Sequence, residues 1–184
     1  MTKPMLFLDV DGVLNAVTRK TPSSWDDWKE TTVLGYRILY SPSVVSFLNA
    51  LSHTVDIVWL STWRNRANVD LAPALGLEGP WVVAEDLVRP GMRVEELLPG
   101  TTRYPWEMSW HKYQVLLSVL AKSDPDVVFA WVDDDLDKKH KVALKRTFVA
   151  QALIIKPYQA VALEPSHLAR LATHFGLLGN SDNL

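Results

Sequence analysis

Five short apolar runs are spaced along the chain, and each has the length of a β-strand. They occupy residues 5–10, 55–60, 81–83, 127–132 and 149–155. Segments with apolar residues at helical spacing lie between most of them. Strands that alternate with helices favour a parallel sheet covered on both faces. The pattern therefore predicts an α/β fold, a Rossmann-like three-layer sandwich around a five-stranded, mainly parallel sheet.

Two helices have clear boundaries in the sequence. Proline fits the first position of a helix, so Pro42 and Pro165 predict the starts of the first clear helix and of the last one. Glycine commonly follows the end of a helix, and Gly176 predicts where the last helix stops. Residues 64–77 also have a helical pattern, but Pro73 should kink or shorten that helix.

Composition limits the organisation of the chain and its partners. The 184 residues, 48% of them hydrophobic, suffice for one core and are too few for two typical domains, so we predict one domain over 1–180 and a frayed tail at 181–184. A formal charge of −2 excludes a global basic field, so any nucleic-acid binding must be local. The absence of cysteine excludes disulfides and thiolate metal sites. No apolar run approaches the roughly 20 residues of a membrane helix, and we expect a soluble, cytoplasmic protein without a membrane partner.

The first strand ends in two carboxylates. In MLFLDVDGVLN, Asp9 and Asp11 follow the apolar run directly, and Gly12 lets the chain turn away. Open α/β folds place their active sites at the carboxyl ends of the strands, so these acids indicate phosphoryl-transfer chemistry. An ordinary acidic turn is the alternative for this motif taken alone. Three further polar groups, in the order that such chemistry needs, favour the functional interpretation.

Hydroxyl groups end the second strand. Ser61 and Thr62 could hold phosphoryl oxygens together with nearby backbone N–H groups, and we favour Ser61 on its spacing from the strand. Serine and threonine after a strand are also common capping residues. Arg64 and Arg66, just beyond, could reach a substrate phosphate, although arginines are frequent on helix surfaces.

A lysine begins the helical pattern in SWHKYQVLLSVL. The helix dipole disfavours a cation in a first turn, so Lys112 needs another reason to be there, and a bound phosphate near carboxylates is one. The alternative is a solvated surface lysine.

The strand at 127–132 runs into four acids: Asp133, Asp134, Asp135 and Asp137. Carboxylates packed this densely at the end of a buried strand repel one another unless a divalent cation offsets the charge, and oxygen-rich sites suit Mg²⁺. An acidic helix N-terminus is the alternative, and it should account for at least one of the four.

These motifs, taken in order, resemble the four motifs of the haloacid dehalogenase (HAD) superfamily, most of whose members are Mg²⁺-dependent phosphatases. The residues that carry the resemblance are Asp9-x-Asp11-Gly12, Ser61, Lys112 and Asp133-Asp134, and it spans about residues 5–155. The sequence VWLSTW, followed by a helix with a lysine and then by WVDDD, is similar to the sequences of small uncapped members, including phosphatase domains found in RNA-repair proteins.

The resemblance implies a role for each motif. Asp9 would be the nucleophile, forming an aspartyl-phosphate, and Asp11 the general acid and base. Ser61 and Lys112 would bind the phosphoryl group. Thr62 and Arg64 are expected to contact the substrate because they lie just past Ser61 in the chain. Mg²⁺ would be held by the Asp9 carboxylate, the Asp11 backbone carbonyl and the adjacent pair Asp133 and Asp134, although members with acids four residues apart would select Asp133 and Asp137. An aspartate at the place of Asp11 argues against dehalogenation.

The chain leaves little room for a separate cap domain over the site. Residues 15–40 can form at most a short flap, and 84–108 is expected to be a long loop with one short helical turn. An open site suits a phosphate at the end of something large, and we expect the substrate to be a nucleic acid end or a nucleotide. A protein or small-metabolite phosphatase is the alternative, and a non-catalytic binding module is a third.

Basic and aromatic residues bear on the substrate. The basic segment 138–146 could contact a nucleic acid backbone, but a solvated helix face is the preferred interpretation, with His140 packed on its apolar side. Of the eight tryptophans, Trp59 and Trp131 should lie in the core. Tryptophans that should border the active-site edge, where they could stack on bases, are Trp25, Trp28, Trp63, Trp106 and Trp110.

Overall fold

The computed structural model describes residues 3–88, 111–148 and 151–177. Its centre is a five-stranded sheet in the order β5-β4-β1-β6-β7, with every neighbouring pair parallel. The strands are β1 (Met5–Leu8), β4 (Asp56–Trp59), β5 (Val82–Val83), β6 (Phe129–Val132) and β7 (Ala152–Ile155). All five predicted strands are confirmed, and the sheet is wholly parallel because helical or loop crossovers separate the strands along the chain.

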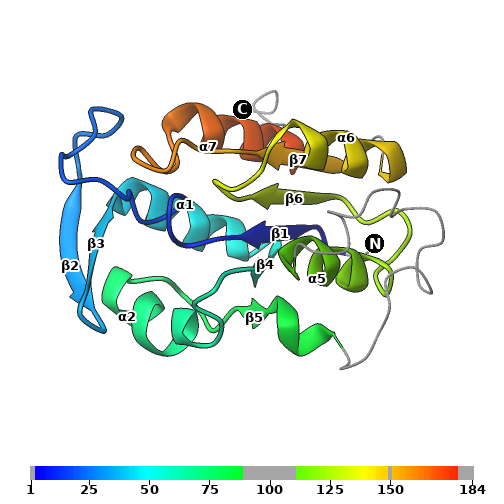
Figure 1. Cartoon of the computed structure of the whole chain (residues 1–184), viewed down its shortest axis with the longest axis horizontal. Helices are drawn as coiled ribbons and strands as arrows, with labels where there is room; N and C mark the ends of the chain where they lie inside the picture. The colour runs from blue at the N-terminus through cyan, green and yellow to red at the C-terminus, as the bar shows by residue number, and fades with distance from the viewer. Residues whose placement is uncertain (1–2, 89–110, 149–150, 178–184) are drawn as a thin grey trace, which may run out of the picture.

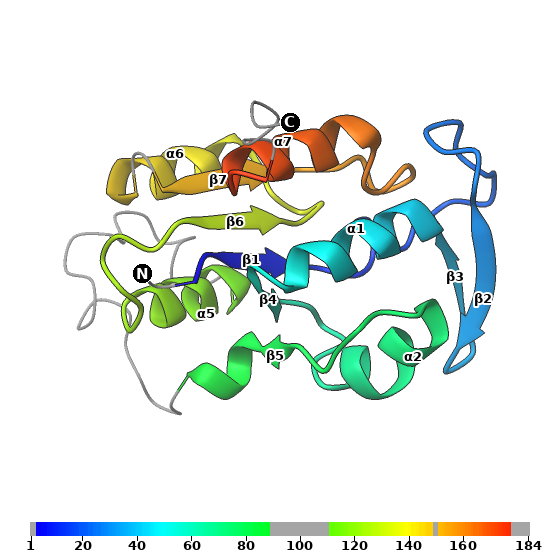
Figure 2. The ribbon, with the colours of Figure 1, turned by 180° about the vertical axis from the view of Figure 1, so that it is seen from behind.

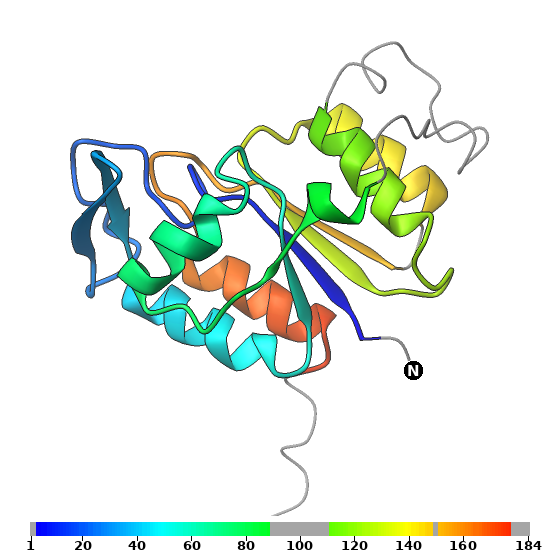
Figure 3. The same cartoon turned by 90° about the horizontal axis from the view of Figure 1, so that it is seen from below.

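Helices cover both faces of the sheet, as the apolar pattern predicts (Figures 1, 2 and 3). One core cluster joins β1 side chains such as Leu6 to α1 (Pro42–Ser52) and α7 (Pro165–His174). The other joins Phe7, which points to the opposite face, to α5 (His111–Leu120) and α6 (Lys138–Thr147). The fold is therefore the three-layer α/β sandwich, with Trp59 and Trp131 fully buried in it.

The predicted helix boundaries are confirmed at α1 and α7. Ser41 caps α1 and Pro42 occupies its first turn, while Gly176 follows the end of α7 in a left-handed conformation. The helix predicted over 64–77 is broken into a π-helical turn, η1 (Ala67–Leu71), and a short α2 (Ala72–Leu75). Pro73 has no N–H to donate to the preceding turn, which is why a regular helix does not run through it.

A two-stranded antiparallel hairpin forms the flap expected within residues 15–40. Its strands are β2 (Lys29–Val33) and β3 (Tyr36–Tyr40), and it stands beyond the carboxyl ends of β1 and β6, toward which their arrows point in Figure 1. The hairpin makes no further sheet with the central one. Within residues 3–88, 111–148 and 151–177, this hairpin is therefore a small cap.

Other predicted features fall partly outside the described residues. The short helical turn expected after residue 84 is η2 (Ala84–Leu87), whereas the rest of the predicted loop, with Trp106 and Trp110, lies outside the described residues, as does the tail at 181–184. In the described part of the chain, no helix combines the length and apolar character needed to cross a membrane.

Candidate active site

The carboxyl edge of the sheet gathers the motif residues. Leu8 is level with Trp59 on one side and with Val132 on the other, so the residues that follow these three positions meet at one edge. Asp9 therefore lies beside Asp133, and both are buried, with exposed fractions of 5% and 0%. Parallel strands explain how segments far apart in the chain bring their acids together.

Three carboxylates form one oxygen cluster. Oxygen atoms of Asp9, Asp133 and Asp134 all lie within 4.8 Å of one another. Asp137 has a different task, because its Oδ1 accepts the backbone N–H groups of Lys139 and His140 and caps α6. The structure thus brings together the adjacent pair that the motif favours, and helix capping accounts for the fourth acid.

Lys112 lies in the middle of these acids. Its Nζ donates to Asp9 Oδ2 and, at 2.8 Å, to Asp133 Oδ2. Burial by itself would lower the lysine pKa, but the charges of Asp133 and Asp9 outweigh it and raise the pKa to about 12. The first-turn lysine of α5 is therefore explained by carboxylate partners and not by solvent.

The cluster still carries an excess of negative charge. Burial and the nearby charge of Asp9 raise the pKa of Asp133 to about 7, and Lys112 only partly offsets them. Burial and the neighbouring carboxylates also raise the pKa of Asp134. Three carboxylates with one ammonium group and only oxygen donors fit a hard divalent cation such as Mg²⁺.

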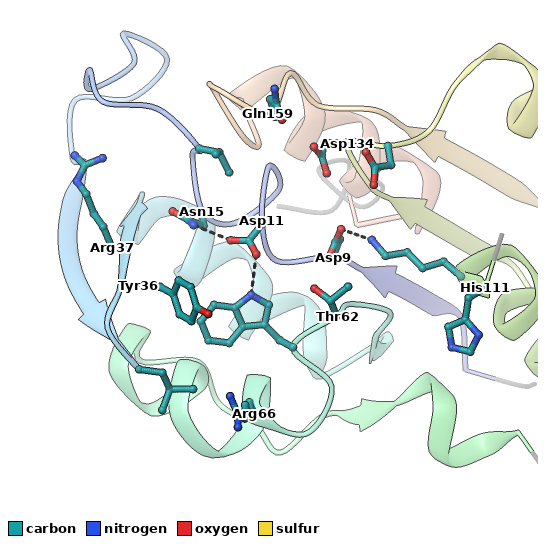
Figure 4. Close-up of a pocket in the computed structure, with 15 residues that line it drawn as sticks. Asp9, Asp11, Asn15, Tyr36, Arg37, Thr62, Arg66, His111, Asp134 and Gln159 are labelled. Atoms are coloured by element: carbon teal, nitrogen blue, oxygen red, sulfur yellow. Dashed lines mark hydrogen bonds and ion pairs between the residues drawn. The ribbon is translucent and has the colours of Figure 1, made fainter.

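Asp11 is held apart from this cluster by two neutral donors. Its Oδ1 accepts a hydrogen bond from Asn15 Nδ2 at 2.8 Å, and its Oδ2 accepts one from Trp63 Nε1 at 2.9 Å (Figure 4). Asn15 Oδ1 also accepts the backbone N–H of Leu39, which ties this arrangement to β3. Two donors on one carboxylate fix its orientation next to Asp9.

Sequence reasoning missed both of these contacts. Trp63 is predicted only as a residue of the active-site edge, and Asn15 is not singled out. The spacing of four residues between Asp11 and Asn15, across the turn at Gly12, is a local signal that could have identified the second. The Trp63 contact spans 52 positions, so no local pattern reveals it.

The hydroxyl pair divides between the interior and the cavity. Ser61 is buried, and its Oγ accepts the Trp63 N–H at 3.4 Å, while Thr62 is exposed and lines the cavity. Arg64 adopts a left-handed backbone conformation, with a φ of 48°, and is not among the residues that line the cavity. Arg66, two residues on, does line it.

Gly12 allows the first and last motifs to approach closely. Its φ is +70°, in the region that glycine adopts at little cost, and a Cβ at this position would lie 2.4 Å from Asp134 Cγ. A side chain here would displace Asp134. The glycine is therefore required by both the turn and the contact.

A cavity of about 880 Å³ opens in front of these groups. Its floor is made by Asp9, Asp11, Lys112 and Asp134, and its walls come from the hairpin, the segment after β4 and the start of α5. Figure 4 shows Tyr36, Arg66, His111 and Gln159 around the opening. The space is much larger than one phosphate group and falls in the size range of ligand sites.

Comparison with known families agrees with this geometry. The model of a family described as the HAD domain in Swiss Army Knife RNA repair proteins matches residues 5–153. The chain belongs to this family. The HAD domain includes β1 to β6 with all four motifs, so the predicted resemblance to a HAD domain related to RNA-repair proteins is confirmed. No curated protein sequence matches the chain.

Membership supports phosphatase chemistry at the level of the superfamily. The buried acidic cluster of this HAD domain agrees with the magnesium dependence that HAD domains generally have. The RNA-repair name belongs to the family and describes the proteins in which such domains occur.

Proposed function

We propose that this protein is a Mg²⁺-dependent phosphomonoesterase that removes the phosphate from a nucleic acid end or a nucleotide through an aspartyl-phosphate on Asp9. The observation that carries the proposal is the arrangement at the sheet edge, where Lys112 bridges Asp9 and Asp133 and Asp11 is held by Trp63. In a HAD domain this arrangement combines a nucleophile, a proton donor and a cation site at one sheet edge.

Asp9, Asp133 and Asp134 would hold the metal ion, together with the Asp11 backbone carbonyl. The fit rests on their shared cluster of oxygen atoms and on the negative charge that Lys112 leaves uncompensated. When bound, Mg²⁺ would neutralise charge on the phosphoryl oxygens and keep the nucleophile ionised.

In the first step a carboxylate oxygen of Asp9 attacks phosphorus. The new bond joins this oxygen to phosphorus, and the bond from phosphorus to the leaving oxygen breaks. Asp11 gives its proton to that leaving oxygen, so the product departs as an alcohol. Lys112, which remains protonated because its pKa is about 12, stabilises the charge of the transferring group together with Thr62, the hydroxyl residue that lines the cavity.

In the second step water hydrolyses the aspartyl-phosphate. Asp11, now a carboxylate, accepts a proton from the water as its oxygen attacks phosphorus, and the bond to Asp9 breaks. The hydrogen bonds from Asn15 and Trp63 keep Asp11 oriented through both steps, since both oxygens of a carboxyl group can accept an N–H whether or not one of them carries the proton.

Two observations support a nucleic acid end as the substrate class. The family is described by its occurrence in RNA repair proteins, and in the part of the chain that the structure describes the β2–β3 hairpin is a small cap, which suits a large substrate. The basic helix α6 is a weaker support, because its apolar side is buried and its lysines are distributed over the solvated face.

The test is phosphate release, with and without Mg²⁺, from oligonucleotides phosphorylated at the 3′ or 5′ end, mononucleotides, small esters and phosphopeptides. We expect Mg²⁺-dependent release from nucleic acid ends and its loss in Asp9→Asn, since the amide is a poor nucleophile of nearly the same shape. Asp56→Asn is the matched control, because this exposed acid begins β4 at the opposite edge of the sheet. Full activity in Asp9→Asn would exclude the mechanism, and release from phosphopeptides or small esters alone would exclude the substrate class.

A further inference from the structure

One side of the cavity is apolar and aromatic, in contrast to its acidic floor. Leu34 and Tyr36 from the hairpin and Trp63 from the segment after β4 form this side, which we call the apolar wall. The ring of Tyr36 packs edge to face on Trp63, with centroids 6.0 Å apart. Leu34 is 48% exposed and Tyr36 is 63% exposed, so both present apolar surface to the cavity and to solvent.

Leu34 is not explained by its local structure. It forms the two-residue hairpin loop with Gly35, and the φ angles of the two are +53° and +82°, the pattern of a type I′ turn. Such turns favour asparagine, aspartate or glycine at the first position, and a leucine there strains the backbone. The side chain gains little burial and lines the cavity, so its apolar surface is available to a bound ligand.

The apolar wall is connected directly to the proposed proton donor. Trp63 Nε1 donates to Asp11 Oδ2 at 2.9 Å, so the wall begins one hydrogen bond from the carboxyl that protonates the leaving oxygen. The group that the wall contacts must therefore belong to the leaving group, the part of the substrate that carries that oxygen. The volume of about 880 Å³ leaves room for a sugar and a base beyond the phosphate.

A cation lies on the same side of the cavity. Arg66 is exposed and lines the cavity, and among the described residues no acid forms an ion pair with it. Arg37, by contrast, is paired with Glu30 at 2.7 Å. A flat apolar surface next to an uncompensated guanidinium matches a base followed by another phosphate, which is the pattern of single-stranded nucleic acid sites.

We propose that the apolar wall holds the base of the terminal nucleotide whose phosphate Asp9 attacks, and that Arg66 contacts the next phosphate along the strand. The substrate class is then a single-stranded nucleic acid with a terminal phosphate. This inference rests on the proposed function and adds the residues that select its leaving group.

The test compares two short single-stranded oligonucleotides with the same terminal phosphate, one carrying a base on the terminal nucleotide and one abasic there. We expect the wild type to prefer the base-bearing strand, and Tyr36→Ala and Leu34→Ala to lower kcat/KM for it at least about fivefold, the lower end of the effect of one stacked base. Turnover of the abasic strand should change little, which shows that the variants remain folded and active. Leu177→Ala is the matched control, because Leu177 is an exposed leucine just beyond α7. The last turn of α7 contacts the amino end of β6 through His174, at the edge of the sheet opposite the cavity.

Arg66→Gln separates the second half of the proposal. We expect it to lower kcat/KM for an oligonucleotide several-fold while leaving a mononucleotide, which has no second phosphate, nearly unaffected. Equal losses on both substrates would overturn the role of Arg66. Equal losses on the base-bearing and abasic strands in the wall variants, no loss in either, or a preference for phosphotyrosine peptides would overturn the role of the wall.

Binding to Asp9→Asn distinguishes failure of this inference from failure of the proposed function. If neither strand releases phosphate in a Mg²⁺-dependent way, the phosphatase proposal fails. The wall is then judged by fluorescence anisotropy of the two strands, where tighter binding of the base-bearing strand that Tyr36→Ala removes supports it. Equal binding of both strands overturns it.

Discussion

Substitution of Gly12 by alanine tests how closely the first and last motifs must approach. Gly12 follows Asp11 in the turn after β1, and its backbone has a φ of +70°. A Cβ there would lie 2.4 Å from Asp134 Cγ and 2.5 Å from Asp134 Oδ2. Ordinary van der Waals contact begins near 3.4 Å, so the carboxylate would have to move by roughly 1 Å (3.4 minus 2.4).

Two separate effects follow from this geometry. The positive φ costs an alanine about 1–2 kcal/mol of stability. The displacement of Asp134 disturbs the oxygen cluster, and a misplacement of about 1 Å in a catalytic site can cost roughly 100-fold in rate. We therefore expect Gly12→Ala to lower kcat/KM by about 10- to 100-fold and to raise the Mg²⁺ concentration needed for half-maximal activity.

Gly76→Ala is the matched control for the backbone effect. Gly76 ends α2 with a φ of +81°, and a Cβ there would meet nothing within 4 Å. Urea denaturation should show a similar loss of stability in both variants, whereas phosphate release as a function of Mg²⁺ concentration should change only in Gly12→Ala. A double variant, Gly12→Ala with Asp134→Ala, should be no slower than Asp134→Ala alone.

Either of two results would contradict this role of Gly12. If Gly12→Ala matches Gly76→Ala in activity and Mg²⁺ dependence, the contact with Asp134 has no functional consequence. If the double variant is much slower than Asp134→Ala, Gly12 acts through another group.

Three further predictions concern single groups. Trp63→Phe keeps an aromatic ring but removes the N–H that Asp11 accepts, so kcat on the abasic strand should fall about tenfold, and an unchanged kcat would deny Trp63 a positioning role. Burial raises the pKa of Asp133 from 3.8 to about 7, so ionisation of Asp133 is less favourable in the folded metal-free protein than in the unfolded chain. The free energy of unfolding, measured in urea, should therefore decrease between pH 4 and pH 7 unless Mg²⁺ is present. His140 Nδ1 accepts the Asp137 N–H at 2.9 Å, and burial lowers the His140 pKa. The free energy of unfolding should therefore decrease as the pH falls below 6.5. The variant His140→Gln can keep the helix cap without titrating and should lose less stability over the same pH range.

The central strands β1, β4 and β6 were predictable because they are mostly buried on both faces. The apolar run of β6 is wholly buried, and such a run is visible in the sequence without reference to any other segment. The hairpin was predicted only as a short flap, because β2 is mostly exposed and only Ile38 and Leu39 of β3 are buried, so neither strand has a continuous apolar pattern. Their position depends on distant contacts, among them the bond from Leu39 N to Asn15 Oδ1.

The site was predictable to the extent that it follows strand ends. Asp9 and Asp133 meet because parallel strands place their carboxyl ends at one edge, and chain order is enough to infer it. The sequence could not show which of the two arginines faces the cavity. Arg64 has a left-handed backbone that redirects the chain, and Arg66 is the one that lines the cavity. A turn of this kind depends on the packing around it and has no clear signal in the residues themselves.

The α/β layers, the order of the motifs and the acids that follow the strands can be inferred from the sequence alone, since apolar periodicity and chain order are local properties. The folded structure was needed to find which carboxylates share one cluster, that Trp63 and Asn15 hold Asp11, and that the hairpin carries an apolar wall to the cavity. The physical reason is that hydrogen bonds and side-chain contacts act over a few ångströms, and the chain folds residues many positions apart into that range only when the whole sheet and its helices have packed.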